Sequence, residues 1–130
     1  MHALLNVGVM AARKAGDSLI RNLNKLDQLK AKATLKGKND FVSDADLIAE
    51  SIIIETIRKH YPDHAILAEE SGTQGESDYK WIIDPLDGTT NFLHGFPVFC
   101  VSIGLMHKDT IEHAVVYDPI KQELFTASNG

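Results

Sequence analysis

The sequence predicts an α+β domain in which two helices cover one face of a largely antiparallel sheet. Before residue 62, two segments carry apolar residues at steps of three and four, which is typical of amphipathic helices. After residue 65, the apolar residues fall in short runs separated by turn residues, which is typical of strands. Helices followed by strands favour an α+β layer, and 130 residues are enough for one compact domain.

The first predicted helix occupies the basic start of the chain. Its apolar positions repeat at helical spacing and are Leu4, Gly8, Ala11, Ala15, Leu19, Leu23 and Leu26. We expect the opposite face to lie in water, because it carries Arg13, Lys14, Arg21 and Lys25.

The second predicted helix follows a break at Lys36-Gly37-Lys38-Asn39-Asp40. We expect it to begin at Ser43-Asp44-Ala45-Asp46, which resembles a cap followed by an acidic first turn. It is predicted to end near Tyr61-Pro62, because the residue before a proline disfavours helix. Its apolar residues are Leu47, Ile48, Ile52, Ile53 and Ile57.

About five strands are predicted in the rest of the chain. They cover residues 65–68, 81–83, 99–106, 111–117 and 124–127. Asp118-Pro119 lies between the last two runs and indicates a hairpin.

Composition and charge narrow the class of protein. No stretch approaches the roughly 20 apolar residues of a membrane span, and the start lacks the pattern of a secretory signal, so a cytoplasmic protein with no membrane partner is expected. Cys100 is the one cysteine, and we expect a buried, inert thiol. Residues 1–38 carry eight basic and two acidic residues (8 − 2 = +6), whereas residues 39–130 carry five and 16 (5 − 16 = −11).

The candidate chemistry lies where two predicted strands end. The run 65–68 stops at Glu69-Glu70, and the run 81–83 stops at Asp84-Pro85-Leu86-Asp87-Gly88. Pro85 fixes φ and Gly88 permits a positive φ, so a turn here can direct both aspartates and the Leu86 carbonyl to one point. Such hard oxygens suit Mg²⁺ or Mn²⁺.

Hydroxyls and free backbone N–H groups follow at once in Gly88-Thr89-Thr90-Asn91, and they favour a bound phosphate. The competing interpretation is structural, because Asp-Gly and Asp-Pro are ordinary turn formers and Glu69-Glu70 is an ordinary solvated loop. The six histidines show no metal-ligand spacing, and His94 is the one expected to border a site.

The segment Trp81 to Pro97, together with Ala68-Glu69-Glu70-Ser71, closely resembles the inositol monophosphatase family, in particular its bacterial SuhB-type members. The resemblance covers essentially the whole chain and implies a layered sandwich of the sugar-phosphatase type. Family members run to about twice this length, so residues 1–130 are expected to be the N-terminal, metal-binding half, with the C-terminal half absent.

The resemblance also implies an activity, a Mg²⁺-dependent hydrolysis of inositol monophosphate by direct attack of a metal-activated water. It assigns metal binding to Glu69, Asp84, the Leu86 carbonyl and Asp87, and catalysis to Glu69 and Thr89. It places the substrate phosphate against Asp87, Gly88, Thr89 and Thr90. Positions near the site, by the same resemblance, are Lys36, Asp46 and Glu70.

A second function remains open. SuhB-type members are associated with transcription and ribosomal RNA processing, so the chain is alternatively a regulatory binding protein that is inactive as a fragment. The basic segment with Lys25, Lys30, Lys32, Lys36 and Lys38 is compatible with such a partner, although a solvated helix end explains it as well. Family members commonly form homodimers, and a homodimer is expected here.

Overall fold

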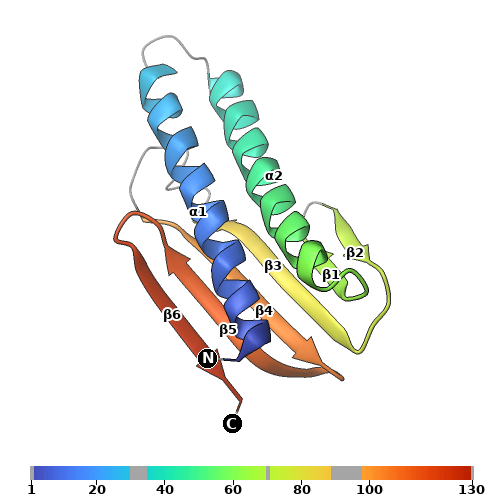
Figure 1. Cartoon of the computed structure of the whole chain (residues 1–130). Helices are drawn as coiled ribbons and strands as arrows, with labels where there is room; N and C mark the ends of the chain where they lie inside the picture. The colour runs from blue at the N-terminus through green and yellow to red at the C-terminus, as the bar shows by residue number, and fades with distance from the viewer. Residues whose placement is uncertain (1, 30–34, 70, 89–97, 130) are drawn as a thin grey trace.

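The structure, a computed structural model, describes residues 2–29, 35–69, 71–88 and 98–129, and for residues 26–29, 35–41 and 43 it describes the backbone alone. Two long helices lie side by side in opposite directions across one face of a six-stranded sheet (Figure 1). The helices are α1 (Ala3–Leu29) and α2 (Leu35–His60). The strands are β1 (Ala65–Ala68), β2 (Gly72–Gln74), β3 (Tyr79–Asp87), β4 (Cys100–His107), β5 (Thr110–Asp118) and β6 (Glu123–Ser128).

The sheet has the order β2-β1-β3-β4-β5-β6, and each adjacent pair is antiparallel except β1 and β3. The predicted α+β class is therefore confirmed, with one parallel pair in a mixed sheet. The Asp118-Pro119 hairpin is confirmed too, and Asp118 Oδ1 accepts hydrogen bonds from the backbone N–H groups of Ile120 and Lys121.

The core lies between the helices and the sheet. Helix α1 buries the predicted positions Ala11, Ala15, Leu19 and Leu23, and its basic face is exposed as expected. From the sheet, alternate residues point toward the helices, and these include Trp81, Ile83, Val101, Ile103, Leu105, Val115 and Tyr117.

The predicted start of the second helix is wrong. The backbone of α2 is helical from Leu35, through the expected break at 36–40 and the expected cap at Ser43. Its buried face also differs, because Val42, Ala45 and Ala49 pack in the core while Leu47 and Ile48 are 45% and 46% exposed. Packing along this face outweighs the cost of about 1 kcal/mol for Gly37 inside a helix.

Two strands differ from expectation. Strand β2 was not predicted, and β3 continues to Asp87 where a turn after Ile83 was expected. Cys100 is half-buried rather than fully buried, because it begins β4 on the face of the sheet that the helices leave open. In the described ranges, no helix is long and apolar enough to cross a membrane.

Candidate metal and phosphate site

Two parallel strands bring the candidate acids to one edge of the sheet. In the β1–β3 pairing, Ala68 lies opposite Ile83, so Glu69 and Asp84 each follow a paired residue at the same level. Their side chains are close enough to hydrogen bond to one another. The parallel pair thus joins acids that are 15 positions apart in the sequence (84 − 69).

A β-bulge brings the third acid, Asp87, near Asp84. Asp84 pairs with Ser102 and Asp87 pairs with Cys100, so β3 has one more residue than β4 between these pairs. Pro85 has no N–H for the ladder, and both Pro85 and Leu86 are buried. Because of the extra residue, the two aspartates stay partly or fully exposed to solvent, while Pro85 and Leu86 between them are buried in the core.

The surroundings of Asp84 perturb its carboxyl group. Burial raises the pKa of its carboxyl above the ordinary value, and the nearby negative charge of Asp87 raises it further. Hydrogen bonds from the Leu86 backbone and the Glu69 side chain act in the opposite direction. Its Oδ1 atom is buried and has no hydrogen bond, so a donor or a cation would satisfy it.

The turn after β3 requires glycine. Gly88 has a φ of +98°, and a Cβ there would lie 3.0 Å from the Val98 carbonyl oxygen and 3.2 Å from the Phe99 Cα. The close approach holds the end of β3 against the start of β4. Thr89 and Thr90, which follow Gly88, lie outside the described residues.

The acids sit beside the open face of the sheet. Asp84 and Ser102 line one end of an apolar hollow of about 280 Å³ that continues over Gly104 and Val116. Cys100 Sγ lies 3.9 Å from Asp87 Oδ2, and the pKa of the thiol is raised by burial and, to a smaller extent, by the acids. Sequence reasoning singled out neither Ser102 nor Cys100 for this edge, because only the β3–β4 register shows that they face the aspartates.

The other predicted site residues lie on α2 or outside the residues that the structure describes. Asp46 lies on α2 and is 8% exposed. Glu50 lies one turn further along the same helix face and is 3% exposed. Sequence reasoning did not single out Glu50, although its spacing of four from Asp46 could have indicated it. Lys36 belongs to α2 by its backbone, and its side chain is not among those described. Glu70 and His94 lie outside the described residues.

The oxygens at this edge are of the chemical kind that a hard divalent cation prefers. The edge offers the oxygens of Glu69, Asp84 and Asp87, the Leu86 carbonyl, and one buried carboxylate oxygen without a hydrogen bond. Within the part of the chain that the structure describes, no three histidine, cysteine or acidic side chains are gathered tightly enough to hold a metal ion by themselves. The acids are joined instead as two neighbouring pairs that share Asp84.

A sequence profile described as the inositol monophosphatase family matches residues 1–130. The chain belongs to the inositol monophosphatase family. Among relatives, it is 52% identical over 132 aligned residues to the Nus factor SuhB of Escherichia coli K12, a match that covers 100% of this chain and 49% of that protein.

Solved structures of the family share the fold. The extragenic suppressor protein SuhB from Bartonella henselae superposes with a TM-score of 0.86 at 44% identity, over 99% of this chain and 49% of that one. The inositol monophosphatase from Anabaena superposes with a TM-score of 0.81 at 41% identity, over 98% of this chain and 44% of that one. The chain thus spans about half the length of the family members it matches, and the sandwich of the sugar-phosphatase type is confirmed for that part.

Proposed function

We propose that the protein acts in transcription, as a regulatory factor of the SuhB type. The observation that carries this proposal is the 52% identity to a protein named a Nus factor. Among solved structures, the identity is 44% to one named SuhB and 41% to one named an inositol monophosphatase. The lysine and arginine side chains of α1 and of the end of α2 add a surface suited to a negatively charged partner. With this role, the protein would act in the cytoplasm, and RNA polymerase would be its partner.

Transcription through a terminator tests the role directly. RNA polymerase transcribes a template with one terminator in the presence of the other Nus factors, with and without the 130-residue chain. The fraction of transcripts that continue past the terminator, the readthrough fraction, is measured. We expect the chain to change this fraction in the same direction as full-length E. coli SuhB, which serves as the positive control. An unchanged fraction, in an assay where the control works, would show that this chain is not such a factor.

A second candidate function is favoured by the acids at the sheet edge, namely Mg²⁺-dependent hydrolysis of inositol monophosphate. Asp84 lies near both Glu69 and Asp87 where β1 and β3 end, and Asp84 Oδ1 lacks a hydrogen bond. When bound, Mg²⁺ would make water more acidic and offset negative charge on the phosphate. The ligands we propose are these three carboxylates and the Leu86 carbonyl.

Side chains and backbone groups of the chain would transfer the proton and bind the phosphate. With a cation bound and Glu69 ionised, the Glu69 carboxylate would accept a proton from the attacking water, and the Thr89 hydroxyl would orient that water. Asp87 and the backbone N–H groups of Gly88, Thr89 and Thr90 would hold the phosphate, because N–H groups at a turn bind anions. Lys36, Asp46 and Glu70 are proposed to stand near this site.

Phosphate release from inositol 1-phosphate, with and without Mg²⁺, tests the second candidate. Asp84→Asn should abolish the release, and it should also abolish the rise in thermal midpoint that Mg²⁺ causes in the unmodified chain. Asp109→Asn is the matched control, because it removes one exposed acid from the opposite end of the sheet, in a left-handed position that asparagine tolerates. Equal Mg²⁺ stabilisation of both variants would remove Asp84 from the ligand set.

A further inference from the structure

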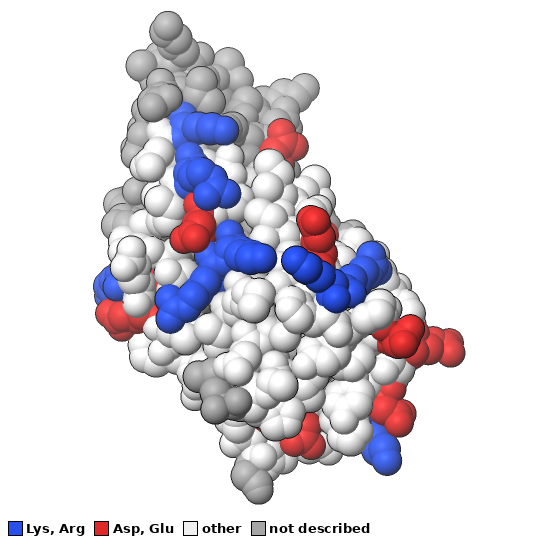
Figure 2. Space-filling model, in the orientation of Figure 1, with Lys and Arg blue, Asp and Glu red and all other residues white. Residues whose placement is uncertain are grey.

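The outer face of the helical layer carries a concentration of positive charge. Figure 2 shows Lys and Arg side chains in a line along α1, with a second group facing them from the end of α2. The basic residues with described side chains on α1 and at the end of α2 are Arg13, Lys14, Arg21, Lys25, Arg58 and Lys59. The whole chain nevertheless has a net charge of −5, so this face opposes the charge of the rest of the molecule.

A channel of about 390 Å³ runs between the two helices on this face. From α1 it is lined by Lys14, Asp17 and Arg21, which lie at steps of three and four on one side of the helix. From α2 it is lined by Ile52, Glu55, Thr56 and Lys59, which follow the same spacing. Cations therefore face the channel from both walls.

The spacing of the cations suits an extended polyanion better than a single small anion. Lys14 and Lys25 are separated by about 16 Å along α1, given the helical rise of 1.5 Å per residue. Arg21 lies between them, and Lys59 faces the line from α2. A nucleic-acid strand carries about one phosphate per 3.4 Å, so several phosphates fit along this distance.

The polar groups of the channel favour contacts with phosphates over contacts with bases. None of its described lining residues is aromatic, so the channel offers no ring on which a base would stack. The Thr56 hydroxyl donates its hydrogen to the Ile52 carbonyl oxygen at 2.8 Å, so it is not available as a donor to a ligand. The lysine and arginine side chains remain as donors, while Asp17 and Glu55 limit how tightly an anion is held.

We propose that this channel binds the phosphate backbone of single-stranded RNA without sequence preference. The proposal rests on the transcription role given above, since a growing transcript is the polyanion that such a factor meets. The acidic residues elsewhere on the chain repel RNA, so bound RNA is directed to this one face.

Fluorescence anisotropy with a labelled single-stranded RNA of about 12 nucleotides tests the proposal. The variant Lys14→Gln, Arg21→Gln, Lys59→Gln neutralises the channel. Its matched control, Lys80→Gln, Lys108→Gln, Lys121→Gln, removes the same charge from the sheet part of the molecule. Circular dichroism checks that both variants keep the fold, which is expected because the three channel side chains are exposed.

We expect the channel variant to bind RNA at least about tenfold more weakly than the control at low salt. The slope of log affinity against log salt should become shallower by about 2, which is 0.7 for each of three lost contacts to a single strand. Equal weakening in both variants, or no RNA binding by the unmodified chain, would overturn the proposal. Better competition by an acidic peptide than by RNA would overturn it too, because the channel would then be a protein-docking surface.

The readthrough assay separates this proposal from the transcription role. If the channel variant loses RNA binding but changes readthrough as the unmodified chain does, the channel binds RNA, and the claim that the transcription role uses the channel is overturned. If the chain binds RNA through the channel but leaves readthrough unchanged, the channel stands and the transcription role fails.

Discussion

At the residue scale, Gly88 and Asp84 show how backbone geometry shapes the acidic edge. Gly88 has a positive φ and lies close to the residues that precede β4, and both features hold the turn that follows Asp87. The raised pKa of Asp84 and its buried Oδ1 atom show that the edge holds negative charge in a partly desolvated place. Such a place is costly in the absence of a cation or a donor.

Replacing Gly88 by alanine should destabilise the chain. The added Cβ would meet the Val98 carbonyl oxygen at 3.0 Å, in a backbone conformation that side chains rarely adopt, so we expect a loss of about 1–3 kcal/mol in the free energy of unfolding. Urea denaturation measures it. Gly104→Ala is the control, because a Cβ there meets nothing within 4 Å, and an equal loss in the control would refute this account of the turn.

His64 makes the stability depend on pH. Its ring stacks on Tyr61 at 4.6 Å and on Tyr79 at 4.8 Å, and its Nδ1 accepts a hydrogen bond from Trp81 Nε1 at 3.0 Å. Burial lowers the pKa of His64, and the charge of Asp63 opposes this only in part. The unfolded chain therefore binds more protons below about pH 6.5, so stability falls as the pH drops from there through the lowered native pKa.

The comparison with His64→Phe isolates this effect, because phenylalanine keeps the stacked ring but does not titrate. We expect the urea midpoint of the unmodified chain to fall more than that of the variant between about pH 7.5 and pH 5.5. Identical pH dependence in the two proteins would show that other groups, such as His113, are responsible; the pKa of His113 is also lowered by burial.

At the element scale, α1 approaches the sheet closely because it has glycines on its inner face. A Cβ at Gly16 would lie 2.6 Å from the Tyr117 ring and 3.1 Å from Pro119 Cβ, and Tyr117 is only 4% exposed. At Gly8 the corresponding distances, to Val115 and Trp81, are 3.3 and 3.4 Å. The helix therefore lies closest to β5 near Gly16.

Gly16→Ala should consequently lower the free energy of unfolding by about 1–3 kcal/mol through overpacking, although alanine is the better helix former. Gly8→Ala should stay within about 1 kcal/mol of the unmodified chain, since a small shift of the Val115 and Trp81 side chains makes room for the Cβ and helix propensity compensates. Thermal denaturation of both variants measures the contrast. A more stable Gly16→Ala would mean that α1 lies further from the sheet than described.

Elements with strong periodicity could be predicted from the sequence, and elements that depend on tertiary packing could not. The Leu19 and Leu23 face of α1 carries its own signal, whereas the start of α2 depends on packing of Val42 and Ala45 that no local pattern reveals. Strand β2 is three residues long and exists through its pairing with β1. Of the site, the sequence indicated the three acids, but the β3 bulge and the facing Ser102 needed the sheet register.

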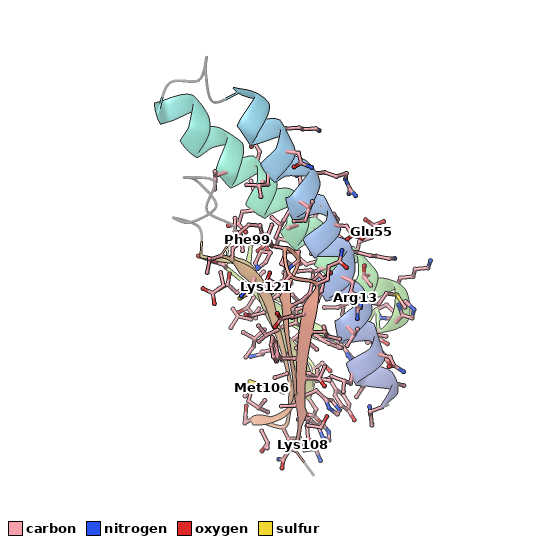
Figure 3. All side chains as sticks on the ribbon, turned by 90° about the vertical axis from the view of Figure 1, so that its left-hand side faces the viewer. Arg13, Glu55, Phe99, Met106, Lys108 and Lys121 are labelled. Atoms are coloured by element: carbon pink, nitrogen blue, oxygen red, sulfur yellow. The ribbon has the colours of Figure 1, made fainter. Side chains whose placement is uncertain are left out.

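At the scale of the whole molecule, one face of the sheet is covered by no helix of the described residues. Figure 3 shows both helices on one side, and Met106 lies on the other. This open face carries Ile111, Val116 and Phe125, which are 48%, 38% and 58% exposed, and Val116 pairs with Phe125 across β5 and β6. An apolar patch of this kind is typical of an interaction surface.

We therefore expect the isolated chain to associate with a second copy through this face. Val116→Thr with Phe125→Thr should weaken the association at least about tenfold, because apolar contact area is lost on both copies. Leu47→Thr with Ile48→Thr, which removes exposed apolar side chains from α2, is the control. Sedimentation at several concentrations measures both variants, and a monomeric unmodified chain would contradict the expectation.

The transcription role that we propose should not depend on the acidic edge, because the basic channel lies on a different part of the molecule. The most direct test measures terminator readthrough for the unmodified chain and for Asp84→Asn in one assay. We predict that both change the readthrough fraction equally. No change with either protein would contradict the transcription role, and a change with the unmodified chain alone would show that the role requires the acidic site.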